Sequence, residues 1–472
     1  MTNQLSMSDS IVIIVYFIGM ILVGVYFSKK IKNNDSFAMA DRSLSLPVVI
    51  GTTVATCMGA GTALGDVGYM FEVGLIGIIS VSMWNLGWIG QNVMASRLRA
   101  SGASSLPEFL EKRYSKSTRN IAAGVLLVMV SNSTAAQFRA GGTILETLGI
   151  MDMKTGIIVG GAVIILFTLF GGLYSVAITD TIHCVVIFIG VAIIVPVVAF
   201  AKAGGVTEVF KRAAVETPDM MSWDSIPFIV LLGYALSYLL AAGSHPAYAQ
   251  RILAAKDIKT AVKGSVWSNI FSFLIEIPVL LVPLTAFIIL PNLENGEMLV
   301  PEVIAVYFPP VLKGVILAGL IALVVTTADS FLLLLSTTIS TDIIPIFKKD
   351  IPDKKALFIS RLIVVIGGML AMILAINGGG VFQLFRMGAA AYGAAMFVPL
   401  ILACFWKKAR TKAVNMGMLL GCILTIAWNQ TQLYVLTEIE GVIIGAIVCL
   451  LVCVIGSLLV DNAIKPHIKH GE

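Results

Sequence analysis

The chain has 472 residues, 58% of them apolar and only 12% charged, and it carries a net charge of +5. With a mean hydropathy of +0.95, this composition excludes an ordinary soluble domain and is typical of a membrane protein. The positive charge does not indicate nucleic acid as a partner, because Lys and Arg fall in short blocks between apolar runs. Residues 1–472 are therefore expected to form a single transmembrane domain in the lipid bilayer.

The first residues, 1–9, lack both the basic region and the small-residue cleavage site of a signal peptide. The apolar segment that follows is therefore expected to remain in the protein as a helix. The six cysteines lie in or beside apolar runs without metal-type spacing, so buried reduced thiols are expected rather than a disulfide framework.

Apolar stretches predict about thirteen membrane-spanning helices, each of about 20 residues, in an all-α fold. The stretches begin near Ile11, Val48, Leu75, Ile121, Thr155, Thr181, Ile226, Val266, Val315, Ala356, Val381, Val414 and Gly441. Basic blocks lie at 29–42, 97–119, 251–263, 348–361 and 407–412 and in the tail. If the N-terminus is outside, all these blocks fall on the cytoplasmic side, as the positive-inside rule requires. The prediction is a multi-pass protein of the cell membrane with its N-terminus outside and its C-terminus in the cytoplasm.

Two of the predicted spans contain an interruption in the middle, CMGAG at 57–61 and GSHP at 243–246. They are five spans apart and so run in opposite directions through the membrane. Glycine and proline are common in membrane helices, but breaks at matching places in two inverted halves are typical of transporters that bind solute at mid-membrane. The predicted repeats are 47–203 and 225–406, with peripheral helices at 9–29 and 413–460.

Three acidic residues, Asp66, Asp180 and Asp329, fall within predicted spans, where each costs about 2.5 to 3.5 kcal/mol unless it meets a cavity, a partner or an ion. Thr326 and Ser330 share a helix face with Asp329, at helical spacings of three and four. Such a face supplies the hard oxygen ligands that a cation such as sodium prefers. The alternative is that these hydroxyls bond back to their own helix turn.

Arg139 and Arg386 also lie within predicted spans. Each is expected to pair with an intramembrane acid. As an alternative for Arg139, its guanidinium group binds a substrate carboxylate in a bidentate fork. His245, beside the proline of the second break, either lines a solute cavity or bonds freed backbone. Trp84 and Trp88 are one helical turn apart and are predicted to be packing residues.

Several short segments carry a family resemblance that extends over nearly the whole chain. They are Asp41-Arg42-Ser43-Leu44, Leu106-Pro107-Glu108-Phe109-Leu110 before Arg113-Tyr114, Gly171-Gly172-Leu173-Tyr174-Ser175-Val176 before Thr179-Asp180, Gln250-Arg251-Ile252-Leu253-Ala254-Ala255-Lys256, and the stretch 326–342. In their order and spacing the chain resembles the sodium:solute symporter family. The resemblance implies a LeuT-type core of five plus five helices in inverted repeats, and symport of sodium with a sugar, amino acid, vitamin, choline, iodide or sialic acid.

The resemblance also implies a sodium site between the second and ninth spans. Ala55, Met58 and Leu323 would supply carbonyl oxygens to the ion, and Thr326 and Thr327 stand where the family places paired hydroxyl ligands.

Some family members bind a further sodium ion through an acid that matches Asp180 and hydroxyls of the ninth span. Here Asp329 and Ser330 occupy that turn, so the site binds either sodium or a proton. One or two sodium ions are thus expected, and no organic cofactor.

The solute is expected to meet residues on both breaks and on the fourth span. These are Cys57, Ala60, Gln137, Arg139, Ser244, His245 and Tyr248. The segments 174–176 and 328–330 resemble the choline-transporter branch, but Cys57 and His245 stand where that branch has tryptophans, and 97–99 resembles the proline-importer branch more weakly. An amino acid, carboxylate or other zwitterion is the predicted solute.

Three alternatives stay open: proton coupling, a choline-like amine as solute, and a transporter-like membrane sensor. An enzyme is not expected, because the sequence shows no convergent nucleophile, base or metal cluster.

Overall fold

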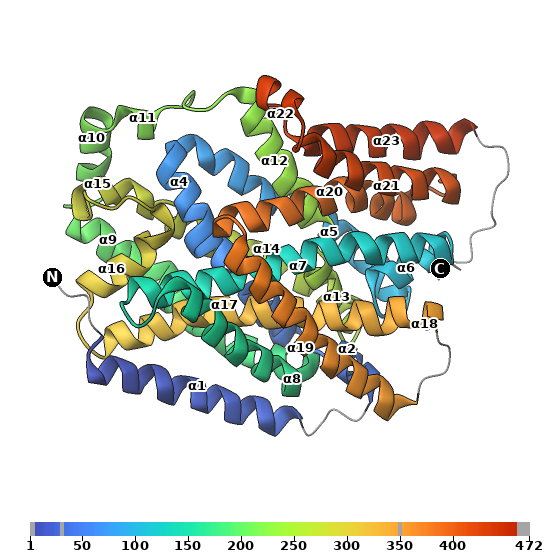
Figure 1. Ribbon diagram of the computed structural model, residues 1–472, viewed down its shortest axis with the longest axis horizontal. Coiled ribbons are helices and arrows are strands. Elements are labelled where there is room, and N and C mark those ends of the chain that lie inside the picture. Colours follow the sequence, from blue (N-terminus) through green and yellow to red (C-terminus); the bar gives the residue numbers. More distant parts are fainter. Residues whose placement is uncertain (1–4, 29–32, 348–351, 460–472) are drawn as a thin grey trace.

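The computed structural model describes residues 5–28, 33–347 and 352–459, which form one packed bundle of α-helices (Figure 1). Across these ranges the only β-type pairing is an isolated bridge between Leu44 and Ala255. The predicted cytoplasmic tail and parts of the basic blocks at 29–42 and 348–361 lie outside the described residues. The all-α prediction is confirmed.

Eleven helical segments in the described part of the chain are long and apolar enough to cross a bilayer, and two shorter apolar segments, 46–57 and 153–169, accompany them. The expected count of about thirteen is therefore not established. The long helices are α1 (Met7–Ser28), α5 (Gly77–Ala100), α7 (Lys116–Thr147), α8 (Met153–Val186), α14 (Ile258–Leu280), α17 (Leu312–Thr337), α19 (Asp353–Asn377), α20 (Val381–Phe405), α21 (Thr411–Trp428) and α23 (Gly441–Leu459).

Helix α8 is kinked at Gly172, and its two halves lie in two different predicted spans. The backbone there has φ +54° and ψ 171°, which a residue with a side chain rarely adopts. Beyond the kink the helix continues through a π-helical stretch (Ile187–Ile194) into α9 (Val195–Lys202). The span that was expected to start near Thr181 therefore starts at this bend, eight to ten residues earlier.

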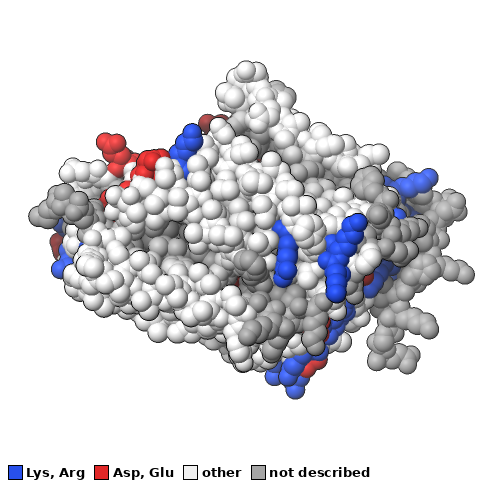
Figure 2. All heavy atoms as spheres, turned by 60° about the horizontal axis from the view of Figure 1, so that its bottom comes forward, with Lys and Arg blue, Asp and Glu red and all other residues white. Residues whose placement is uncertain are grey.

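The outside of the bundle is apolar, as a lipid-facing surface requires. Large apolar side chains such as Leu22, Leu166, Phe358 and Leu370 are more than half exposed. Contiguous exposure on this scale is rare on soluble monomers. Figure 2 shows one broad face with few charges, on which Lys and Arg lie mostly toward the right-hand end and acidic side chains toward the upper left. This distribution is consistent with a bilayer-spanning bundle.

Helix α17 runs through the middle of the bundle and is buried along nearly its whole length (Figure 1). It packs against α1, α3 (Leu46–Cys57), α7, α8 and α19. Its threonines and Asp329 are therefore in the protein interior and not at the lipid surface.

Arg386, on α20, pairs with an acid, as the sequence suggested. Its Nη1 lies 2.8 Å from Oε2 of Glu440, whose side chain is 2% exposed. The guanidinium also lies 4.5 Å from the ring centroid of Tyr234. This intramembrane charge is neutralised within the bundle.

Candidate ion and solute site

The first predicted break is present at the end of α3. The helix ends at Cys57, and Met58 has φ −76° and ψ 70°, outside the helical region. The chain resumes as a π-helical turn (Gly61–Asp66) that leads into α4 (Val67–Val73). Because the helix stops here, the last carbonyl groups of α3 are free to meet side chains of another helix.

Two threonines of α17 face these carbonyl groups. The Thr326 hydroxyl donates to the Ala55 carbonyl at 3.1 Å and is 3.2 Å from the carbonyl of Leu323. The Thr327 hydroxyl donates to the carbonyl of Thr56 at 3.3 Å. Both threonines are buried. The structure thus brings together four of the five residues expected at the sodium site, and these oxygens are the ligand type a hard cation needs.

Met58, the fifth residue of that set, is buried where α3 ends. The alternative that threonines bond to their own turn applies in part, because Thr326 also reaches the carbonyl three residues before it. Its second contact, across to α3, is what sets it apart from an ordinary helix threonine.

Gly59 allows α3 and α17 to approach this closely. A Cβ atom at Gly59 would lie 2.6 Å from Oγ1 of Thr327 and 3.0 Å from Cγ2. We expect Gly59→Ala to displace Thr327 and reduce the apparent sodium affinity at least tenfold, measured by thermal shift in sodium. Gly141→Ala is the control. Its Cβ atom would lie 3.7 Å from the side chain of Val324, which is on α17 like Thr327, and this is an ordinary contact distance. Equal sodium affinity in both variants would contradict the close-approach argument.

An arginine that the sequence placed in a cytoplasmic block lies in the core. Arg251 is on α13 (Pro246–Ala254), is fully buried, and donates hydrogen bonds to Thr52 (2.9 Å), Thr56 (2.6 Å) and Ser330 (2.7 Å). It also donates to the carbonyl of Ala247. The guanidinium therefore uses its fork geometry to join α3, α13 and α17.

Arg251 also forms an ion pair with Asp180, at 3.2 Å between Nη2 and Oδ2. The same oxygen accepts from the Thr52 hydroxyl at 2.6 Å. Asp180 and Ser330, expected as ligands of a further ion, are thus both hydrogen-bonded to Arg251. Oδ1 of Asp180 and Oδ2 of Asp329 are buried, and neither has a hydrogen-bond partner among the described residues.

The second predicted break is also present. α12 (Phe228–Gly243) ends at Gly243, His245 has φ −58° and ψ 121°, and α13 begins at Pro246. Proline has no N–H to continue the ladder of the preceding helix, which explains a new helix starting there. The break changes the direction of the chain between α12 and α13, so that Arg251 points into the bundle.

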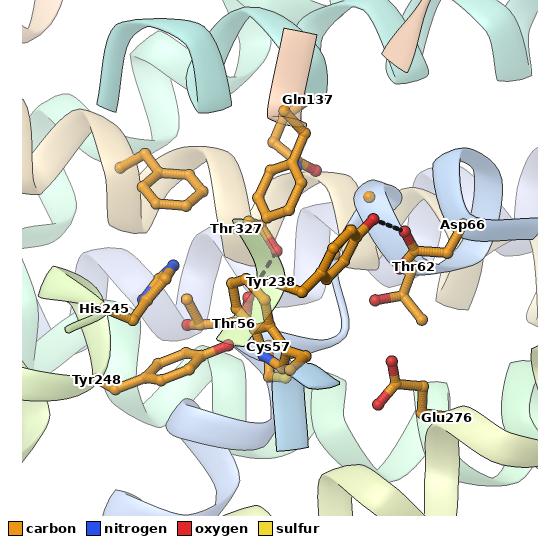
Figure 3. Close-up of a pocket in the computed structure, with 15 residues that line it drawn as sticks. Thr56, Cys57, Thr62, Asp66, Gln137, Tyr238, His245, Tyr248, Glu276 and Thr327 are labelled. Carbon is orange, nitrogen blue, oxygen red and sulfur yellow. Dashed lines mark hydrogen bonds between the residues drawn. The ribbon is translucent and has the colours of Figure 1, made fainter. Parts of the chain in front are cut away.

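A pocket lies between the two breaks (Figure 3). The cavity among its lining atoms has a volume of about 20 Å³, room for about one water molecule, so the walls must move apart to admit a solute. Its lining consists of Thr56, Cys57, Gly59, Gly61, Thr62, Asp66, Trp84, Gln137, Tyr238, His245, Tyr248, Glu276, Thr327, Phe331 and Phe385.

The expected solute residues divide into two groups. Cys57, Gln137, His245 and Tyr248 line the pocket, and the Ala60 amide donates to Oε1 of Gln137 at 3.0 Å.

Arg139 and Ser244 do not line the pocket. Nη1 of Arg139 donates to the carbonyl of Ala375 at 3.1 Å, and the Ser244 hydroxyl bonds back to Leu240. Their expected role toward a solute has no support from this geometry.

Sequence reasoning missed Tyr238, Glu276 and Phe385 and took Trp84 for packing alone. Glu276 is a single acid inside an apolar stretch, so the rule that singled out Asp66 also applied to it. The aromatic residues carry no such signal, because buried rings are ordinary in membrane helices.

The sequence profile of the sodium:solute symporter family matches residues 37–421. The chain belongs to the sodium:solute symporter family. The family couples the movement of a small solute to sodium, so membership implies sodium as the coupling ion. The chain is 28% identical to the sodium/proline symporter of Escherichia coli, over 92% of this chain and 90% of that protein. It is 25% identical to the osmoregulated proline transporter OpuE of Bacillus subtilis, over 96% and 95%.

Solved structures agree on the fold. A sodium-coupled sialic acid symporter in a substrate-bound, outward-open state superposes with a TM-score of 0.82 at 19% identity, covering 98% of this chain and 99% of that one. The nucleobase-cation symporter Mhp1 in a closed conformation gives 0.58 at 13% identity, over 89% and 93%. The expected LeuT-type fold is thereby confirmed.

Proposed function

We propose that the protein imports a small organic solute with an amino group across the cell membrane, driven by sodium bound at Ala55, Met58, Leu323, Thr326 and Thr327. The observation that carries this is the convergence of α3 carbonyl oxygens and α17 hydroxyls at the break beside the pocket. Proline is the first solute to test, because it appears in the names of the relatives from both bacteria.

Coupling follows from what the two sites share. Thr56 and Thr327 are hydrogen-bonded to each other at the ion site, and both also line the pocket. An ion that draws the break of α3 toward α17 therefore also shapes the pocket wall, and a bound solute favours the same arrangement of the break. Because such coupling is reciprocal, each ligand raises the affinity for the other.

Alternating access would involve the two proposed repeats, 47–203 and 225–406. Each contains one broken helix, and the pocket lies where they meet. Rocking of one repeat against the other around the pocket would expose it to each side in turn, with the N-terminus outside.

We propose a single sodium ion per cycle. Arg251 already places a positive charge against Asp180 and Ser330, two residues expected to bind a second ion. One charge that moves inward gains about 2.3 kcal/mol per 100 mV, which supports roughly 40-fold accumulation of a neutral solute at that potential. The sodium gradient adds to this ratio.

Proton coupling is a second candidate, favoured by one observation. Oδ2 of Asp329 is buried without a hydrogen-bond partner in the described part of the chain, so Asp329 is an acid that protonation would satisfy. An inward proton gradient without sodium would drive uptake in this case.

The test is uptake of radiolabelled proline and other amino compounds into proteoliposomes with an inward sodium gradient, an inward potassium gradient or an inward proton gradient. We expect at least one of these compounds to accumulate, and only with the sodium gradient. Accumulation with protons alone would replace sodium coupling by the proton mechanism, and equal uptake in all three gradients would contradict coupled transport.

A further inference from the structure

The pocket contains two buried carboxyl groups. Asp66 and Glu276 are each 4% exposed, and both line the pocket. Asp66 accepts a hydrogen bond from the Tyr238 hydroxyl, and Oε2 of Glu276 accepts one from Nδ2 of Asn85 at 2.5 Å. Within the described ranges neither acid takes part in an ion pair. Two acids at membrane depth without a basic partner are unfavourable in their ionised form unless a cation joins them.

The described part of the chain supplies no such cation to the pocket. No Lys or Arg lines the pocket. Arginines inside the bundle are engaged elsewhere, since Arg139 bonds a backbone carbonyl, Arg251 pairs with an acid outside the pocket, and Arg386 pairs with Glu440. Arg113, also buried, donates to the carbonyl groups of Trp406 and Lys407. The one basic residue of the lining is His245.

His245 is held between rings. Its imidazole stacks on Tyr248 with centroids 4.1 Å apart and lies 5.4 Å from the ring of Trp84. Nδ1 of His245 is buried and lacks a partner among the residues that the structure describes. The imidazole thus forms part of an aromatic wall and makes no contact with either acid.

Further aromatic rings line the pocket beside hydroxyl and amide side chains. Trp84 lies 5.9 Å from Tyr238 and 5.7 Å from Phe385, measured between ring centroids. In Figure 3, Asp66 and Glu276 are drawn on one side of the pocket, and His245 and Tyr248 on the other. Acidic oxygens facing aromatic rings form a surface that attracts a cationic nitrogen through charge and through cation–π contact.

We propose that the pocket selects organic cations, solutes with a positively charged amino or quaternary nitrogen and no carboxylate of their own, and that Asp66 and Glu276 determine this selectivity. The inference rests on the proposed function, because sodium drives the solute. A zwitterion such as proline would bring its carboxylate into a pocket that has two acids and no guanidinium to receive it. A cationic solute also makes each cycle carry two positive charges, one on sodium and one on the solute.

The first experiment compares compounds with and without a carboxylate on the purified wild-type protein at pH 7 in saturating sodium. The pairs are prolinamide and proline, choline and glycine betaine, and putrescine and ornithine. We expect at least one cation to raise the melting temperature with an apparent Kd at least tenfold below that of its carboxylate-bearing partner. Tighter or equal binding of the carboxylate-bearing compound in every pair overturns the proposal, and so does no shift by any of the cations.

The second experiment uses Asp66→Asn and Glu276→Gln, which keep the shape and remove the charge. We expect the apparent Kd of the best cation to rise at least tenfold in each variant, with the shift caused by sodium alone unchanged. Glu297→Gln is the control, because Glu297 lies outside the pocket and accepts from the amide of Phe382. Equal cation affinity in all three variants overturns the proposal.

The melting temperature measured with sodium alone distinguishes the proposed sodium symport from the proposed preference for organic cations. If sodium stabilises the wild-type protein but no charge preference appears, the cation proposal fails and sodium symport stands. If sodium gives no shift beyond that of potassium, the proposed function itself fails. If Asp66→Asn or Glu276→Gln abolishes the sodium shift, the acids bind the coupling ion and not the solute, which also overturns the cation proposal.

Discussion

We expect Thr326→Val to lower the apparent sodium affinity of the protein at least tenfold. Valine keeps the branched shape but lacks the hydroxyl oxygen that lies 3.1 Å from the Ala55 carbonyl and 3.2 Å from that of Leu323. The loss of one hard ligand removes about 1.4 kcal/mol or more of binding free energy, since this amount corresponds to tenfold in affinity. The measurement is the sodium dependence of the melting temperature, at constant ionic strength with potassium.

Two variants serve as controls, one at Thr326 itself and one at a buried threonine of another helix. Thr326→Ser retains the hydroxyl and is expected to keep sodium affinity within a few-fold. Thr168→Val removes a buried hydroxyl on α8 that only bonds back to the carbonyl of Ile164, and should leave sodium affinity unchanged. A Thr326→Val protein with wild-type sodium affinity would show that the hydroxyl is not a ligand.

Arg251→Gln is expected to have the largest effect on stability. The guanidinium is fully buried and is ion-paired with Asp180, so its removal leaves an acid charge in the core. Removal of one partner of a buried pair typically costs about 3 to 5 kcal/mol of the free energy of unfolding. Thermal and denaturant unfolding of the purified variant measure this loss, which should come with a loss of transport.

The double variant Arg251→Gln with Asp180→Asn tests the cause. Because both charges are then absent, we expect it to recover a large part of the stability lost in Arg251→Gln. Arg212→Gln is the surface control, since its ion pair with Glu216 is exposed to solvent and is expected to contribute little to the free energy of unfolding. No recovery in the double variant would mean that hydrogen bonding to Thr52, Thr56 and Ser330 outweighs the charge pair.

Much of the fold and the ion site follow from local sequence. Apolar runs long enough to span the bilayer determine the helices, and Gly59 and Pro246 mark the two breaks because glycine and proline change backbone geometry locally. Thr326, Asp329 and Ser330 were identified for the same reason, because they share one face of an apolar helix, whereas the pairing of Thr326 with Thr327 came from the family resemblance.

The partners of the core charges were not predictable in this way. Arg251 follows an apolar stretch and precedes a basic block, so its sequence context is that of a cytoplasmic flank. The chain turns at His245, and this turn directs α13 into the bundle. As a result, Nη2 of Arg251 lies 3.2 Å from Oδ2 of Asp180, which is 71 residues away in the sequence. The ring of Trp84 likewise acquires a role only when distant helices enclose the pocket, whereas Glu276 could have been noticed as an acid inside an apolar stretch.

The most direct test of sodium coupling at the α3–α17 site is equilibrium binding of ²²Na⁺ to the purified protein, because it requires no knowledge of the solute. We predict saturable binding of one ion per chain, displaced by unlabelled sodium but not by potassium, and strongly reduced in Thr326→Val. Absence of saturable binding to the wild-type protein, or equal binding to Thr326→Val, would contradict the account.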